Sequence, residues 1–207
     1  GSILKRVAEK GFPRLRMRSV TALGAVAVAL AGCGGTVNLS ANFPAPMTKR
    51  LPLTAQVQYP ESLREFSHME EALDTTRWTI ALGGPSMRML DSVLGSCLTL
   101  LPAGGAGSGP DLIIEPEIIR FELSVPGASK VDIPAAWVEF DIRIMGADGA
   151  PLTRLKIPGY GESSHGGGGL GRNLSEAAEY ALRDAGATLT QELGQDAAIL
   201  ALIGSRS

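Results

Sequence analysis

The chain has 207 residues with 19 basic and 21 acidic side chains, and its formal net charge is -2. Because no block of like charge runs through the body of the sequence, a nucleic-acid partner is not expected. Hydrophobic residues make up 44% of the chain but aromatic residues only 5%, and 26 Gly and 13 Pro predict many turns around a modest core in a single domain.

An export signal is predicted at the N-terminal end of the sequence. An apolar run without charge extends from Val20 to Leu30, and it is shorter than the roughly 20 residues that a membrane-spanning helix needs. Basic residues precede it, namely Arg14, Arg16 and Arg18. A basic region followed by a short apolar region is the pattern of a signal peptide. Met17 is the predicted natural start, and residues 1–16 are interpreted as a vector remnant or a misplaced start.

The apolar run ends in Leu30-Ala31-Gly32-Cys33, which resembles the lipobox of bacterial lipoproteins. The resemblance implies that Leu30, Ala31 and Gly32 are recognised by a signal peptidase, which cuts before Cys33. It also implies a diacylglycerol group on the Cys33 thiol and an N-acyl chain such as palmitate, and several chains hold a membrane more firmly than one. The enterobacterial lipoproteins that this pattern resembles carry Asp after the cysteine when they stay in the inner membrane. Gly34 stands there instead, so the expected location is the periplasmic face of the outer membrane.

The expected domain boundaries follow from this anchor. Residues 1–32 form the leader and signal peptide, residues 33–50 a lipidated flexible tether, and residues 51–207 a single periplasmic domain. The tether is predicted because the sequence from Gly34 to Lys49 is small, polar and interrupted by prolines.

The first half of the domain is expected to contain two strands and a helix. Alternation from Leu53 to Tyr59 predicts a strand that ends at Pro60, and residues 77–82 predict another. Residues 61–73 stay open between a helix and a hairpin arm. Ser86 is the predicted N-cap of a helix that ends at Pro102. Its apolar stripe consists of Met87, Leu90, Leu94, Cys97, Leu98 and Leu101.

Cys97 is the only cysteine besides Cys33. Once Cys33 is acylated, no disulfide within the chain is possible, although the expected compartment is oxidising. Cys97 lies on the apolar stripe of the helix, and we therefore expect it to be buried.

The second half predicts three strands and a long helix. Residues 119–125 and 138–144 alternate clearly, with Ile119 expected on the buried face, and a Gly-Ala-Asp-Gly turn at 146–149 predicts a returning strand over 152–160. Ser175 is the predicted N-cap of the last helix. The stripe of that helix consists of Ala178, Leu182, Ala185, Leu189 and Leu193, and a short turn over 197–203 follows. The expected class is α+β, a mainly antiparallel sheet with two main helices on one face.

Catalytic and metal-binding patterns are weak. His68 and His165 are the only histidines, which excludes a site of three histidines, and no metal site is predicted. Ser164 and His165 could serve a hydrolase, but adjacent residues on a glycine-rich loop without Gly-x-Ser-x-Gly favour a solvated loop. The glycines of 166–169 lack the Gly-Lys-Ser/Thr ending of a phosphate loop. No catalytic residue and no cofactor other than the acyl groups is predicted.

Two further pairs leave alternatives open. Glu115 and Glu117 flank Pro116, and they could form a carboxylate pair, although acids beside a proline are typical of a protected sheet edge. Trp78 and Trp137 could line a ligand cleft, although a core this poor in aromatic residues favours a structural role for both.

The sequence resembles small proteobacterial envelope lipoproteins in four features. These are the lipobox, the strands of 111–145, the segment Ile157-Pro158-Gly159-Tyr160-Gly161, and the Ala-rich last helix running into Gln195-Asp196. The YajG type and the ABC-transporter auxiliary lipoproteins are examples of such lipoproteins. The resemblance implies a non-enzymatic accessory or assembly subunit that binds other envelope proteins. The alternative is a carrier for a lipid or other apolar ligand, which would need a large apolar cavity, whereas a subunit would need a packed core and an apolar surface patch.

Overall fold

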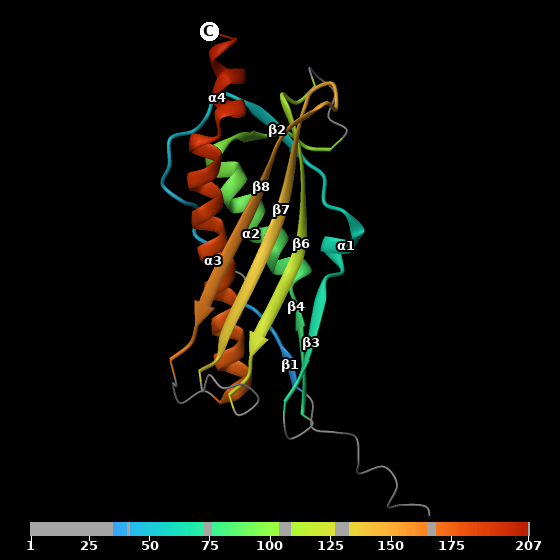
Figure 1. The fold of residues 1–207 in the computed structure, drawn as a ribbon, viewed down its shortest axis with the longest axis vertical. Helices are drawn as coiled ribbons and strands as arrows, with labels where there is room; N and C mark the ends of the chain where they lie inside the picture. The colour runs from blue at the N-terminus through green and yellow to red at the C-terminus, as the bar shows by residue number, and fades with distance from the viewer. Residues whose placement is uncertain are drawn as a thin grey trace, which may run out of the picture. The chain divides into compact units, whose positions relative to one another are not determined.

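Five strands form the larger of two sheets, in the order β5-β2-β6-β7-β8 (Figure 1). The computed structural model describes residues 35–40, 42–72, 76–103, 109–126, 133–164 and 169–206, all within the unit Gly32–Ser207. The strands of this sheet are β2 (Thr54–Val57), β5 (Thr99–Leu100), β6 (Leu112–Ser124), β7 (Ala135–Gly146) and β8 (Pro151–Glu162). The smaller sheet has the order β1-β4-β3, formed by β1 (Gly35–Val37), β3 (Ser67–Glu71) and β4 (Arg77–Ala81).

Two long helices cover one face of the larger sheet. The helices are α1 (Glu61–Arg64), α2 (Gly83–Cys97), α3 (Leu170–Gln195) and α4 (Ala197–Gly204). In Figure 1, α2 and α3 lie behind the long strands β6, β7 and β8. These three strands pair antiparallel, whereas the short strands β1, β2 and β5 pair in parallel. The predicted α+β class with a mainly antiparallel sheet is confirmed.

Alternation along the long strands builds the core. Val138, Phe140, Ile142 and Ile144 are buried on the inner face of β7, as predicted. The tight turn after β7 is also confirmed, because Gly149 adopts a φ of 78° and the Gly146 amide donates to the Ala150 carbonyl at 2.8 Å. Ile119 differs from the prediction. The register between β6 and β7 shifts between Ile118 and Arg120, so Ile118 is buried while Ile119 is 43% exposed.

Helix α3 approaches β8 unusually closely. A Cβ on Gly159 would lie 2.7 Å from the Ala185 Cβ, and a Cβ on Gly161 would lie 2.6 Å from the Tyr180 Cβ. Small residues on both sides therefore bring the backbones together and leave no space between helix and strand. The predicted stripe of Ala178, Leu182, Ala185, Leu189 and Leu193 is fully buried, which confirms the orientation of this helix.

Both predicted helix starts are wrong. Helix α2 begins at Gly83, and its first amides are satisfied by the Phe66 carbonyl, which accepts from Leu82 at 2.9 Å and Gly83 at 3.0 Å. Ser86 therefore lies inside the helix. Helix α3 begins at Leu170, after Gly169 with a φ of 79°. Ser175 lies inside it and donates to the Asn38 carbonyl at 2.7 Å.

The predicted burial of Cys97 is confirmed. Helix α2 ends at this residue rather than at Pro102, because the chain turns into β5. Its buried stripe includes Met89 and Val93, while the predicted Met87 is only partly buried. The Cys97 side chain is 3% exposed, and burial raises the pKa of its thiol.

The described part of residues 61–73, which ends at Ala72, combines the two structures that the sequence left open. Residues Glu61–Arg64 form the single helical turn α1, and Ser67–Glu71 form β3, which pairs antiparallel with β4 as a hairpin arm. The hairpin joins the smaller sheet because β4 also pairs with β1 on its other side.

The described part of the expected tether differs from the prediction. Gly35–Val37 form β1, which pairs in parallel with β4 in the register Gly35 to Trp78. Farther along, the Ser92 hydroxyl donates to the Phe43 carbonyl at 3.1 Å, and the Arg50 guanidinium donates to the Gly95 carbonyl at 2.8 Å. The chain from residue 35 onward is thus attached to the domain at several points. Composition alone suggested a tether because its small, polar residues bury little themselves.

Helix α4 closes the C-terminal end of the described chain. The Asp196 carboxylate caps it by accepting from the Ala198 and Ile199 amides, each at 3.0 Å. Beyond the helix, the Arg206 guanidinium contacts the Asp111 carboxylate at 2.5 Å. Asp111 also accepts from the Thr54 amide at 2.8 Å, so one carboxylate joins the C-terminal end to the start of β2.

Candidate functional site

The residues of the predicted lipid anchor lie outside the described residues. This holds for Cys33 and for Leu30, Ala31 and Gly32, the predicted recognition residues. The anchor therefore stays a prediction from the sequence. Among the described helices, none combines the length and hydropathy that crossing a membrane requires.

The proposed hydrolase pair is described only in part. Ser164 is exposed at the end of β8, and His165 lies outside the described residues. The neighbouring Ser163 is buried, and its hydroxyl donates to the Glu176 carboxylate at 2.9 Å. Ser163 therefore joins β8 to α3.

The other candidate chemical groups take part in structural contacts. His68 Nε2 lies 2.9 Å from the Glu70 carboxylate, and its ring meets the edge of Phe121 at a centroid distance of 5.1 Å. Glu115 pairs with Arg143 at 3.0 Å across β6 and β7. Over the described ranges, no three side chains among His, Cys, Asp and Glu gather in a way that could hold a metal ion.

The two tryptophans have different environments. Trp78 lies between β1 and α3, where a Cβ on Gly35 would overlap its ring and a Cβ on Gly171 would lie 3.0 Å from it. Its role is therefore packing. Trp137 instead is 39% exposed on β7, on the face of the sheet that the helices leave open.

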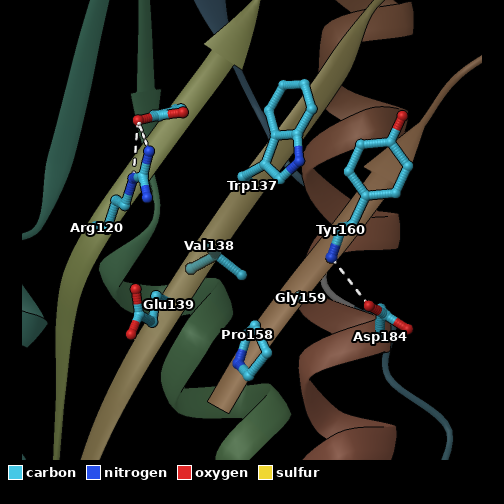
Figure 2. A pocket seen from close by; sticks show the side chains of 9 residues that line it. Arg120, Trp137, Val138, Glu139, Pro158, Gly159, Tyr160 and Asp184 are labelled. Carbon is cyan, nitrogen blue, oxygen red and sulfur yellow. Dashed lines mark hydrogen bonds and ion pairs between the residues drawn. The ribbon is translucent and has the colours of Figure 1, made fainter. Parts of the chain in front are cut away.

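Trp137 forms a pair with Tyr160, which the sequence analysis did not select. The two residues are register partners on β7 and β8, and their ring centroids lie 5.0 Å apart with a tilt of 44°. Both rings stand on the open face in Figure 2. The sequence held a signal for this. Gly159 and Gly161 alternate with Pro158 and Tyr160, and close packing of the glycines against α3 directs the larger residues outward.

A surface cleft of about 550 Å³ surrounds this aromatic pair. Its lining residues come from β6, β7, β8 and α3 (Figure 2). The side chains that matter for its chemistry are Arg120, Glu122, Trp137, Glu139, Tyr160 and Asp184. We refer to it below as the aromatic cleft.

Hydrogen bonds hold Tyr160 in position. Its hydroxyl donates to the Glu162 carboxylate at 2.8 Å, and its backbone amide donates to the Asp184 carboxylate of α3 at 2.9 Å. The bond to Glu162 is the main reason why the pKa of the Tyr160 phenol is raised, so the ring stays neutral at physiological pH. The Tyr160 ring is thus held in place before any ligand binds.

The aromatic cleft is acidic. Among the described residues, its lining contains one cation, Arg120, and three carboxylates, Glu122, Glu139 and Asp184. Arg120 is already paired with Glu122, since its Nε donates to that carboxylate at 2.8 Å. Among the described residues, Glu139 forms a long ion pair with Lys156 at 4.0 Å. The described lining of the cleft therefore combines aromatic faces with an excess of carboxylates over cations.

A second cleft, of about 420 Å³, lies where the N-terminal segment crosses α3. The Glu179 carboxylate accepts from the Ser40 amide at 2.5 Å and from the Ser40 hydroxyl at 2.7 Å. Since Glu179 is buried, these bonds supply the partners that its charge requires. We interpret this region as the site where the N-terminal segment packs on the domain.

Comparison with known proteins finds similarity in structure only. No family model matches the sequence, and no curated protein matches it. The fold is similar to that of protein XCC0632 from Xanthomonas campestris, described by the family model DUF330, with a TM-score of 0.50 at 16% identity over 84% of this chain and 99% of that one. A minor lipoprotein from Acinetobacter baumannii gives a TM-score of 0.41 at 8% identity, covering 68% of this chain and 91% of that one. A putative lipoprotein from Caulobacter crescentus gives 0.41 at 15% identity, covering 74% and 93%.

Proposed function

We propose that this chain is a lipid-anchored, non-enzymatic accessory subunit of a cell-envelope complex, and that it binds a partner protein through the aromatic cleft. The observation that carries the proposal is the exposed pair of Trp137 and Tyr160 on the face that the helices leave open. Exposed aromatic residues are enriched at protein interfaces, because they bury large areas at a small cost in conformational entropy.

The anchor in this proposal is Cys33. A signal peptide that ends in Leu30-Ala31-Gly32 supports cleavage before this residue and its acylation. Gly34 supports the outer membrane, on its periplasmic side, over the inner membrane. The acyl chains would confine the subunit to the surface where its partner lies.

The contact between α3 and β8 favours a subunit over a carrier. A ligand held between sheet and helix would need space there, but Gly159 and Gly161 bring the backbones of the two elements too close for even a methyl group. The apolar surface patch that a binding subunit needs is supplied by Trp137 and Tyr160.

Site-specific photocrosslinking in native membranes tests this proposal. A photoreactive phenylalanine replaces Trp137 in one variant and Arg143 in a control. Both positions lie on the open face of β7, and their side chains are exposed. We expect a discrete crosslinked product with an envelope protein from position 137 and none from position 143. Equal products from both positions, or none from position 137, would refute the proposed contact.

A further inference from the structure

The charges of the aromatic cleft indicate what kind of partner group fits it. Three carboxylates face one arginine, and Glu122 already neutralises that arginine. Glu139 and Asp184 line the same cleft as the aromatic pair (Figure 2). A second anionic group would meet repulsion here, whereas a cation would gain two carboxylates within one cleft.

The aromatic pair favours the same sign of charge. The face of an indole or phenol ring carries negative electrostatic potential, so a guanidinium or ammonium group is attracted to it. Trp137 and Tyr160 are 39% and 42% exposed, so both can be reached from solvent. By donating to the Glu162 carboxylate, the Tyr160 hydroxyl makes its ring richer in electrons.

Recognition in this region must use side chains rather than strand addition. Strand β8 is the outer strand of the larger sheet, but Pro158 has no amide hydrogen and the Tyr160 amide already donates to Asp184. An incoming strand would lack these donors at the level of the cleft. A partner therefore contacts the cleft with projecting side chains.

We propose that the aromatic cleft receives an arginine or lysine side chain from an exposed basic segment of the partner protein. The cationic group lies over Trp137 and Tyr160, and Glu139 and Asp184 supply the opposite charge. This proposal rests on the proposed function, since it names the chemistry of the partner that the accessory subunit would bind.

Peptide titration of the purified full chain tests the proposal. The probes are hexa-arginine, hexa-lysine, hexa-glutamate and the neutral sugar triacetylchitotriose, and binding is followed by calorimetry. We expect the two basic peptides to bind, with an affinity that falls as salt rises, and the other two probes not to bind. Preferential binding of the sugar would replace the proposal with a glycan site, and binding of hexa-glutamate would overturn it.

Matched variants separate the cleft from general attraction to an acidic protein. Glu139→Gln and Glu115→Gln remove the same charge from the same face of the sheet, and the two parent side chains are 30% and 28% exposed. We expect Glu139→Gln and Trp137→Leu each to weaken hexa-arginine binding on the order of fivefold, the size of a cation–π contact. Glu115→Gln should leave it unchanged. Equal effects of the two Glu→Gln variants, or no effect of Trp137→Leu, would overturn the proposal.

A fluorescence readout gives an independent measurement. The chain has two tryptophans, so Trp78→Phe leaves Trp137 as the only tryptophan, which is excited selectively at wavelengths that tyrosine does not absorb. Hexa-arginine should then change the emission of Trp137, and an unchanged emission during calorimetric binding would place the peptide elsewhere. Peptide binding does not depend on acylation of Cys33. If hexa-arginine binds while photocrosslinking finds no envelope partner, the cation site stands and the proposed function fails.

Discussion

Gly159 and Gly161 set the distance between β8 and α3, and they thereby decide which residues of β8 face outward. A Cβ at either position would overlap backbone or side-chain atoms of α3. Gly194, also on α3, has open space around the position of a Cβ. The same residue type is therefore required at the first two positions and dispensable at the third.

Gly161→Ala should destabilise the domain by about 1–3 kcal/mol, because the added methyl group has no room and the helix must shift. Gly194→Ala is the matched control, and it should stabilise α3 by roughly 0.5–1 kcal/mol because alanine restricts the unfolded chain. Chemical denaturation of both variants measures the difference. Equal stability of the two variants would contradict the close packing of α3 on β8.

Cys33 is the residue on which the proposed location depends. Cys33→Ser should abolish the incorporation of labelled palmitate and release the protein from membranes, because the prediction assigns the acyl chains to this thiol. Intact mass and membrane fractionation measure the two effects. A Cys97→Ser variant should keep the acyl label, since Cys97 is buried within the domain. Label on Cys33→Ser protein would place the anchor elsewhere.

At the scale of elements, the periodicity of apolar residues correctly predicted those strands and helices whose burial follows from their own sequence. Alternation predicted β7 correctly because its inner residues face one continuous core, and the stripe of α3 was correct for the same reason. The predicted start of α2 was wrong because the Phe66 carbonyl, 17 residues earlier in the chain than Gly83, accepts from the Leu82 and Gly83 amides. Strand β1 was missed because its three residues become a strand only beside β4. Such nonlocal partners leave no periodicity in the sequence.

The candidate site was predicted only in part, for a related reason. Trp137 was recognised as a possible cleft residue, but a low aromatic content favoured a structural role. Its partner Tyr160 follows 23 positions later in the sequence, and only the register of β7 and β8 brings the two rings together. Side-chain pairs across two strands can be predicted from the sequence once the type and length of the turn fix the register of the strands.

The bonds of Ser40 to Glu179 should decide how firmly the N-terminal segment is held. Glu179→Ala removes the buried acceptor of both bonds, and we expect amide exchange over residues 36–40 to become at least about tenfold faster, since a bond to a charged group contributes about 1.5–3 kcal/mol. Glu192→Ala, on the same helix, should not change it. Hydrogen exchange with mass spectrometry measures this, and equal exchange in both variants would show that pairing with β4 suffices.

At the scale of the whole molecule, Asp111 connects the C-terminal end of the described chain to the start of β2. Its carboxylate accepts from Thr54 at the start of β2 and pairs with Arg206 beyond α4. The pairing with Arg206 lowers the pKa of Asp111 to about 2. A carboxyl group has a pKa of roughly 3.9 in an unfolded chain. Folding therefore favours the charged form of this residue.

Asp111→Asn should consequently cost stability in a pH-dependent way. The lowered pKa means that the contribution of Asp111 is fully present above about pH 5, declines below roughly pH 4 and is lost as the pH falls through about 2. The wild-type and variant proteins should thus differ most near neutral pH and converge in acid. Thermal unfolding at a series of pH values measures the difference. A constant difference down to about pH 2 would show that Asp111 acts through its hydrogen bonds alone.

Strand β1 finally bears on how far the protein can reach. Only Gly34 separates Cys33 from the first residue of β1, and two residue steps extend at most about 7 Å. An acylated Cys33 would therefore hold the domain directly at the membrane surface, because the link between the lipid and β1 is too short to act as a flexible tether. A partner must then come to the membrane surface itself, where the short link raises its effective concentration. A partner located farther from the membrane would need a segment of its own that extends to the membrane surface.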